Sequence, residues 1–204
     1  MAFTYFFRDL QTLNTAVKYL VPFSSGATKV RVWDAGCAMG QEPYSMAILL
    51  AEAMNHFAYR NLKIYATDID GSNLFRDIIA SGAYPTEELE RIPRELFDKY
   101  FIPATKPGHH QIVDQVRSRL EFQRQDLLQL QPPATEISLV LCKNVLLHFQ
   151  PHERVEVMKM FHRALVPGGF FATEQTQKLP PELEPYFEQV SPDCQMFRKI
   201  GGPI

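Results

Sequence analysis

The stretch V-R-V-W-D-A-G-C-A-M-G-Q-E-P-Y-S, residues 30–45, decides which fold this chain can adopt. Its first six residues are mostly apolar, which predicts a buried strand that ends before Gly36. Gly36 and Gly40 permit a tight turn, and Pro43 is tolerated in the first turn of a helix. The apolar residues that follow recur at helical spacing: Ala47, Leu50, Ala51 and Met54. The stretch therefore predicts a strand, a glycine-containing turn and a helix, in that order.

The rest of the chain continues this alternation. Apolar segments predict further strands at residues 62–67, 120–123, 137–142 and from 170 onward. Apolar spacing predicts helices over residues 4–20, 72–79 and 153–165, with Ser72 as the cap of the second. Residues 186–190 and 195–200 predict a final antiparallel pair. Such alternation is typical of an α/β fold, a doubly wound and mostly parallel sheet with helices on both faces.

Residues 82–119 interrupt this alternation. They contain two helical pieces within residues 85–101, and the alternating run I-V-D-Q-V-R at 112–117 predicts a small strand pair. A chain of 204 residues is long enough to bury one full core. We therefore expect a single domain over residues 1–204, with an antiparallel last strand and a small β insert at about 82–119.

The composition argues against several classes of protein. A net charge of −2 without a cluster of Lys and Arg argues against a nucleic-acid partner. Three widely spaced cysteines indicate neither a disulfide framework nor a metal site. The sequence shows no signal peptide and no apolar run of roughly 18 residues. We expect a cytoplasmic protein that is not inserted in a membrane.

Acidic side chains follow the predicted strands at the edge where an open α/β sheet binds ligands. The glycine turn matches neither G-x-G-x-x-G nor G-x-x-x-x-G-K-[ST], which favours a nucleoside without phosphate. Asp68 is placed to accept hydrogen bonds from ribose hydroxyls, and Asp126 from an exocyclic adenine amine. Glu42 suits a cationic part of the ligand. The alternative for each acid is a solvated residue at a strand end or a helix cap.

Several segments in order along the chain resemble the CheR-type methyltransferases of bacterial chemotaxis. The matching segments are T-Y-F-F-R (4–8), R-V-W-D-A-G-C-A-M-G-Q-E-P-Y-S (31–45), A-T-D-I-D (66–70), L-C-K-N-V-L-L-H-F (141–149) and L-V-P-G-G-F-F (165–171). The resemblance spans nearly the whole chain. It implies a Rossmann-like class I fold and the cofactor S-adenosylmethionine (SAM), which yields S-adenosylhomocysteine. It also implies methylation of glutamate side chains on chemoreceptors.

The resemblance also implies which residues form the site. It places Asp68, rather than Asp70, at the family's acidic step after the second strand. Gly36 lets the ligand approach the backbone of the turn closely. The predicted cofactor-binding residues are Thr4, Arg8, Gly36, Glu42, Asp68, Asp126, Leu127, Lys143 and Asn144.

The chain departs from the family pattern at several positions. Gln41 stands where the family usually has Glu, Lys143 where it has Arg, and Asp126 where Asn is common. His148 takes the place of an active-site tyrosine. The helical N-terminal domain of the family is missing from this sequence. These departures loosen the assignment of the acceptor.

We expect Arg8 and His148 to be the catalytic residues. Arg8 is suited to hold the acceptor carboxylate or the carboxylate of the cofactor with its planar fork. His148 is suited to hydrogen-bond the acceptor acid, or to act as a base for an alcohol or amine. The alternatives are a helix-surface charge for Arg8 and a buried structural histidine for His148.

The leading hypothesis is a SAM-dependent protein-glutamate O-methyltransferase whose partner is a chemoreceptor or another signalling protein. One alternative is a methyltransferase with a different acceptor. Another is a SAM-binding signalling module that does not turn over.

Overall fold

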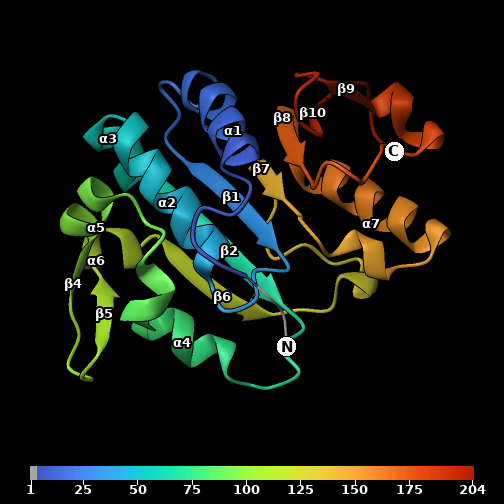
Figure 1. Ribbon diagram of the computed structural model, residues 1–204. Coiled ribbons are helices and arrows are strands. Elements are labelled where there is room, and N and C mark those ends of the chain that lie inside the picture. Colours follow the sequence, from blue (N-terminus) through green and yellow to red (C-terminus); the bar gives the residue numbers. More distant parts are fainter. Residues whose placement is uncertain (1–3) are drawn as a thin grey trace.

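The computed structural model describes residues 4–204, which contain two β-sheets (Figure 1). The larger sheet has the strand order β6-β2-β1-β7-β8-β10-β9. Its strands are β1 (Val30–Ala35), β2 (Leu62–Asp68), β6 (Leu120–Arg124), β7 (Ile137–Leu141), β8 (Leu165–Ala172), β9 (Phe187–Gln189) and β10 (Met196–Lys199). All pairs from β6 to β8 are parallel, whereas β10 is antiparallel to β8 and β9. The prediction of a mostly parallel sheet with an antiparallel end is confirmed.

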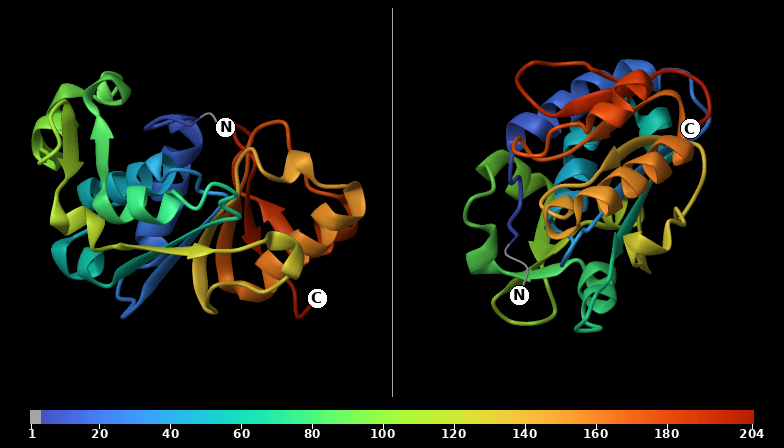
Figure 2. Two further views of the ribbon diagram at one scale, coloured as in Figure 1. Left: turned by 90° about the horizontal axis from the view of Figure 1, so that it is seen from below. Right: turned by 90° about the vertical axis from the view of Figure 1, so that its right-hand side faces the viewer.

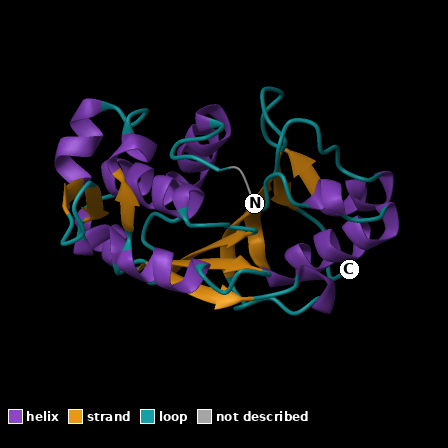
Figure 3. Cartoon of the chain, turned by 60° about the horizontal axis from the view of Figure 1, so that its bottom comes forward, coloured by secondary structure: helices purple, strands orange, loops and turns teal. Residues whose placement is uncertain are grey.

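Helices cover both faces of this sheet (Figure 3). Val32 of β1 belongs to the core shared with α1 (Leu10–Phe23) and α2 (Gln41–Ala53). The next residue, Trp33, points to the other face, where its ring meets Phe161 of α7 (Pro151–Ala164) edge-on at 5.1 Å. The short helices between the strands of the larger sheet are α3 (His56–Arg60), α4 (Phe75–Ser81), η2 (Leu127–Gln129), η3 (Leu146–His148) and η4 (Pro181–Tyr186). None of the helices within residues 4–204 has the length and apolar character needed to cross a bilayer.

The smaller sheet lies at the opposite end of the molecule from the C-terminal strands (Figure 2). Its order is β3-β5-β4, and both pairs are antiparallel. It consists of β3 (Ala83–Pro85), β4 (Phe101–Pro103) and β5 (His109–Ile112), with η1 (Thr86–Leu89), α5 (Arg94–Tyr100) and α6 (Asp114–Arg117). The prediction of strand structure over residues 112–117 was wrong beyond Ile112, where β5 ends and α6 follows. Ile112 and Val116 are both buried, and their four-residue spacing also fits one helical turn.

The direction of the crossovers changes at β1. From β1 the chain continues outward to β2 and β6 on one side, and to β7 and β8 on the other. In open α/β sheets, ligands bind beyond the carboxyl ends of the strands at such a switch point. The loops that follow β1, β2, β6 and β7 are therefore the expected walls of a site.

The N-terminal helix begins later than its sequence predicts. α1 starts at Leu10 rather than at residue 4. Phe7 and Asp9 have φ angles of 59° and 53°, which lie in the left-handed region and are incompatible with a right-handed helix. Residues 4–9 therefore form a separate segment that reaches the sheet before the helix starts.

Asp70 joins Ser72 at the start of α4, where the Ser72 hydroxyl accepts from the amide of Leu74 at 3.3 Å. One Asp70 oxygen accepts from the amide of Leu74 at 3.3 Å and the other from that of Phe75 at 3.2 Å. The Ser72 hydroxyl donates to Asp70 at 2.8 Å. The sequence could not predict how Asp70 and Ser72 share this role, because both residue types are common helix caps.

Candidate active site

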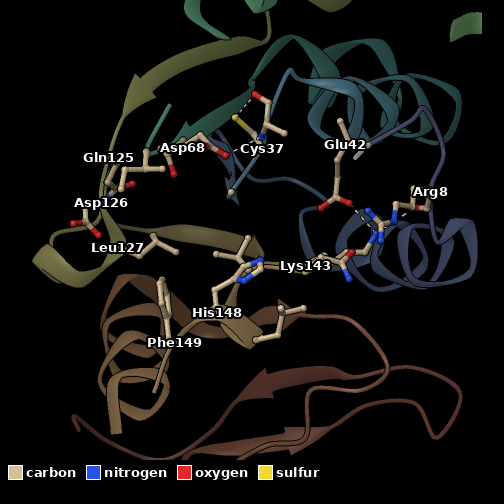
Figure 4. A pocket seen from close by; sticks show the side chains of 18 residues that line it. Arg8, Cys37, Glu42, Asp68, Gln125, Asp126, Leu127, Lys143, His148 and Phe149 are labelled. Carbon is tan, nitrogen blue, oxygen red and sulfur yellow. Dashed lines mark hydrogen bonds and ion pairs between the residues drawn. The ribbon is translucent and has the colours of Figure 1, made fainter. Parts of the chain in front are cut away.

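A cavity of about 600 Å³ opens beyond the carboxyl ends of β1, β2, β6 and β7 (Figure 4). All the residues predicted for the site line it: Thr4, Arg8, Gly36, Glu42, Asp68, Asp126, Leu127, Lys143, Asn144 and His148. The remaining lining residues were not predicted: Cys37, Ala38, Thr67, Ile69, Gln125, Val145, Leu147 and Phe149. The fold thus brings the predicted residues together, while their contacts with a cofactor remain predictions.

The glycine turn after β1 passes very close to the loop after β7. Gly36 has a φ of 98°, and a Cβ placed there would lie 2.1 Å from Cγ2 of Val145. The amides of Gly36 and Cys37 both donate to the carbonyl of Thr67, at 2.7 and 3.0 Å. Glycine is required at position 36 both for its conformation and for this approach. At Gly36 the turn therefore presents backbone without a side chain at one wall of the cavity.

Asp68 at the end of β2 is fixed by backbone donors. Its Oδ2 accepts from the amide of Ala38 at 3.0 Å, and its Oδ1 from the amide of Asp70 at 3.0 Å. Each carboxylate oxygen keeps a second lone pair for a ligand hydroxyl. Asp126 is similarly anchored, since its Oδ1 accepts from the amide of Leu128 at 2.9 Å. Asp126 is therefore a helix cap and a lining residue at once.

Glu42 and Lys143 form an ion pair inside the site. Lys143 Nζ lies 2.8 Å from Glu42 Oε2, and the Lys143 side chain is 1% exposed. Burial raises the pKa of the Glu42 carboxyl, and the positive charge of Lys143 opposes this rise. Burial, reinforced by repulsion from Glu42, raises the pKa of Asp34 well above its usual value. Asp34 was not predicted, although it lies two residues before Gly36.

Glu174 shapes the loop that carries Asn144. Asn144 has a φ of 59°, and its amide donates to Glu174 Oε2 at 2.8 Å. The Thr173 hydroxyl lies 2.7 Å from the same oxygen. Glu174 is 4% exposed and follows β8, on the far side of β7 from the glycine turn. No local sequence signal identifies it, because its partner lies 30 residues away.

Arg8 and His148 reach the cavity from outside the sheet (Figure 4). Arg8 lies in the segment before α1, so the alternative of a charge on a helix surface is wrong. His148 ends η3 and is exposed, so the alternative of a buried structural histidine is wrong. Both side chains therefore lie at the cavity wall.

The lining residues suit SAM in size and in chemistry. The cavity volume lies within the range of roughly 300–1,000 Å³ that is typical of ligand sites. Asp68 offers acceptors to ribose hydroxyls, and the apolar side chains of Leu127 and Phe149 offer flat contact to a base. Residues 36–40 carry no Lys or Arg, in keeping with a ligand that has no phosphate. Glu42 adds a carboxylate to the same cavity, where it pairs with Lys143.

Comparison with known proteins agrees with this chemistry. Residues 2–196 match the family model "CheR methyltransferase, SAM binding domain". Chemotaxis protein methyltransferase 2 of Pseudomonas aeruginosa is 34% identical over 145 residues, covering 70% of this chain and 51% of that protein. Chemotaxis protein methyltransferase 1 of the same organism is 31% identical over 191 residues, covering 87% of this chain and 67% of that protein.

A third relative is much longer than this chain. It is an uncharacterized 104.1 kDa protein of Rhodobacter capsulatus, 31% identical over 172 residues. The match covers 82% of this chain and 18% of that protein. The chain thus spans between 18 and 67% of the length of these three relatives.

A solved structure supports the fold. PKMT2 of Rickettsia typhi, in complex with AdoHcy, matches with a TM-score of 0.50 at 11% identity. The match covers 85% of this chain and 26% of that one, and at this identity it shows the fold alone. The match to the family model extends over nearly the whole sequence. The chain therefore belongs to the CheR methyltransferase family and comprises its SAM-binding domain.

Proposed function

We propose that this chain transfers the methyl group of SAM to a glutamate side chain of a protein, most simply a chemoreceptor. One observation carries the proposal. Arg8 and His148 line the same cavity as the acids that suit the cofactor. A guanidinium and an imidazole that line one cavity can both hydrogen-bond a carboxylate. The names of the relatives in Pseudomonas aeruginosa support a role in chemotaxis.

The side chains divide into two tasks. Asp68, Asp126 and Glu42 hold the nucleoside and the cationic end of the cofactor. Arg8 orients the acceptor carboxylate, and His148 donates a second hydrogen bond to it. When bound, SAM supplies a methyl group on a sulfonium cation, and in-line displacement yields S-adenosylhomocysteine.

The proposed reaction needs no general base. A glutamate carboxylate with an ordinary pKa near 4.3 is already ionised at pH 7. The contribution of the protein is therefore to position the two reactants, which can supply much of the rate enhancement. An imidazole at His148 also suits an alcohol or amine acceptor, which does need a base.

The test is methyl transfer from labelled SAM to peptides that contain glutamate. A matched peptide with glutamine in place of glutamate is the control. We expect label only in the glutamate peptide, released as methanol at alkaline pH because a methyl ester hydrolyses there. Label that resists alkali would indicate a different acceptor. S-adenosylhomocysteine binding without transfer to any acceptor would indicate a SAM-binding module.

A further inference from the structure

Residues 4–9 form a segment that brings Arg8 to the cavity. Thr4 and Arg8 both line it, while the chain between them follows an unusual path. Phe7 and Asp9, on either side of Arg8, both have left-handed φ angles. Such conformations are uncommon for residues other than glycine, and they persist only where surrounding contacts fix them. The contacts that hold this segment therefore determine where Arg8 sits.

The N-terminal side of the segment is held by the core. Phe6 is buried and meets the rings of Tyr84 and Phe101 edge-on, at 5.0 and 5.6 Å. The amide of Phe7 donates to the hydroxyl of Ser45 at 2.8 Å. These contacts fix the chain as far as Phe7. They do not account for the left-handed turn at Asp9.

The C-terminal side of the segment is held by Lys143. Its ammonium donates to the carbonyl of Arg8 at 3.2 Å and lies 3.5 Å from Asp9 Oδ2. The third partner is Glu42 Oε2 at 2.8 Å. Of the three donors of the ammonium, two thus have protein acceptors, and the Asp9 carboxylate lies at ion-pair distance. Although Lys143 lines the cavity, its charged end is directed to the protein rather than to a ligand.

We propose that Lys143 is a positioning residue, which fixes the backbone of Arg8 so that the guanidinium meets the acceptor carboxylate. This inference rests on the proposed function of Arg8. Lys143 joins three parts of the chain at one point: the loop after β7, the start of α2 at Glu42, and the segment at Arg8 and Asp9. Loss of the lysine frees the carbonyl of Arg8 and leaves two carboxylates without their shared cation. Arg8 then loses its fixed orientation while its side chain remains present.

A double-mutant cycle separates positioning from a direct effect. The variants are Lys143→Met, Arg8→Ala and the double variant, assayed with the glutamate peptide. We expect Lys143→Met alone to lower kcat by about 100-fold, as misplacement of a catalytic group does. In the Arg8→Ala background, Lys143→Met should lower kcat by less than about threefold, because the two substitutions act on one interaction. An equal loss in both backgrounds would overturn the inference.

Two matched variants complete the cycle. Lys143→Arg keeps the charge and the donors and should recover most of the lost rate; failure to do so would count against the inference. Lys159→Met removes a lysine of α7 that pairs with Glu156 at 2.8 Å, away from the cavity. It should leave kcat unchanged, and a loss equal to that of Lys143→Met would also contradict the inference.

Hydrogen exchange tests the same inference without any acceptor. The amides of Thr12 and Leu13 donate to the carbonyl of Asp9, at 3.0 and 3.2 Å, so their protection depends on the turn at Asp9. With S-adenosylhomocysteine present, amides within residues 4–13 should exchange about tenfold faster in Lys143→Met than in the wild type or Lys159→Met. If Lys143 only neutralised the charge of Glu42, these amides would exchange in Lys143→Met at the wild-type rate. That result would overturn the inference. Faster exchange in Lys143→Met together with no methyl transfer by the wild type would reject the proposed function. It would leave intact the role of Lys143 in holding the segment.

Discussion

The cavity has two halves that are built in different ways. The half that we propose for the cofactor consists of Gly36, Asp68 and Asp126 at the ends of β1, β2 and β6, where backbone amides hold both carboxylates. The half that we propose for the acceptor consists of Arg8 and His148, which lie on segments outside the sheet. Formation of the sheet therefore brings the cofactor half together directly. The acceptor half depends on contacts between distant parts of the chain. We therefore expect substitutions in it to affect the acceptor without affecting cofactor binding.

The largest effect should come from Gly36→Ala in the cofactor half. The new methyl group would meet Val145 Cγ2 at 2.1 Å, at a φ of 98° that alanine rarely adopts. We expect the free energy of unfolding to fall by about 3 kcal/mol, from strain and overpacking together. Urea denaturation measures this change. Adding Val145→Ala should restore part of it.

Gly71→Ala is the matched control for this change. A Cβ at position 71 has nothing within 4 Å, and we expect its effect to stay within about 0.5 kcal/mol. If Gly36→Ala were as stable as this control, the close approach of the two loops would be wrong.

Arg8→Ala should damage the acceptor half alone. We expect kcat/KM for a glutamate peptide to fall about 100-fold, or about 2.7 kcal/mol, because the acceptor loses a charged hydrogen-bond partner. S-adenosylhomocysteine affinity should change less than about threefold, and stability by less than about 1 kcal/mol. Steady-state kinetics and calorimetry measure the two quantities. Arg94→Ala, which removes an exposed arginine of α5, is the control, and equal activity of the two variants would reject the assigned role.

Asp68→Ala should have the converse effect. It removes the acceptors proposed for the ribose hydroxyls, so S-adenosylhomocysteine binding should weaken by about 2 kcal/mol. The KM for the acceptor should stay nearly constant. Asp77→Ala on α4 removes an exposed carboxylate and serves as the control. Unchanged affinity in Asp68→Ala would remove Asp68 from the site.

The smallest effect concerns a group that belongs to neither half. His162 is buried on α7, and burial lowers the pKa of its imidazole, helped by the charges of Lys199 and Arg163. The unfolded chain then binds a proton more readily, so stability is fully present above the usual pKa of about 6.5 and is lost as the pH falls below it. We expect a loss on the order of 1 kcal/mol between pH 7.5 and pH 5, measured by urea denaturation.

His162→Phe should reduce this dependence on pH, while His152→Phe at an exposed position should not. A profile that is the same in the wild type and His162→Phe would contradict the assignment. Because His162 lies outside the cavity, its titration should leave S-adenosylhomocysteine affinity unaffected.

The difference between the halves also explains what the sequence could predict. The strands β1, β2, β6 and β7 fall within one residue of their predicted ends, since buried apolar runs bounded by glycine or acid give a clear local signal. The residues predicted for the site all line one cavity, because their motifs follow those strands. The family resemblance was needed to add Thr4, Arg8, Leu127 and His148.

The failures lie where distant residues decide the local structure. The start of α1 was predicted too early because Ser45 and Lys143, far along the chain, hold the left-handed turns at Phe7 and Asp9. The segment P-G-G at 167–169 was predicted to lie before the fifth strand, which was expected from residue 170 onward. It lies inside β8 instead, where the pairing with β7 contains an irregularity. Glu174 was missed for the same reason, since its partner Asn144 lies on another loop.

The most direct test of this account is calorimetric titration of the purified chain with S-adenosylhomocysteine. We expect one site with a Kd in the micromolar range, about −8 kcal/mol, that is weakened by Asp68→Ala and little changed by Arg8→Ala. A folded chain that releases no heat, or that binds equally well with and without the Asp68 carboxylate, would contradict it.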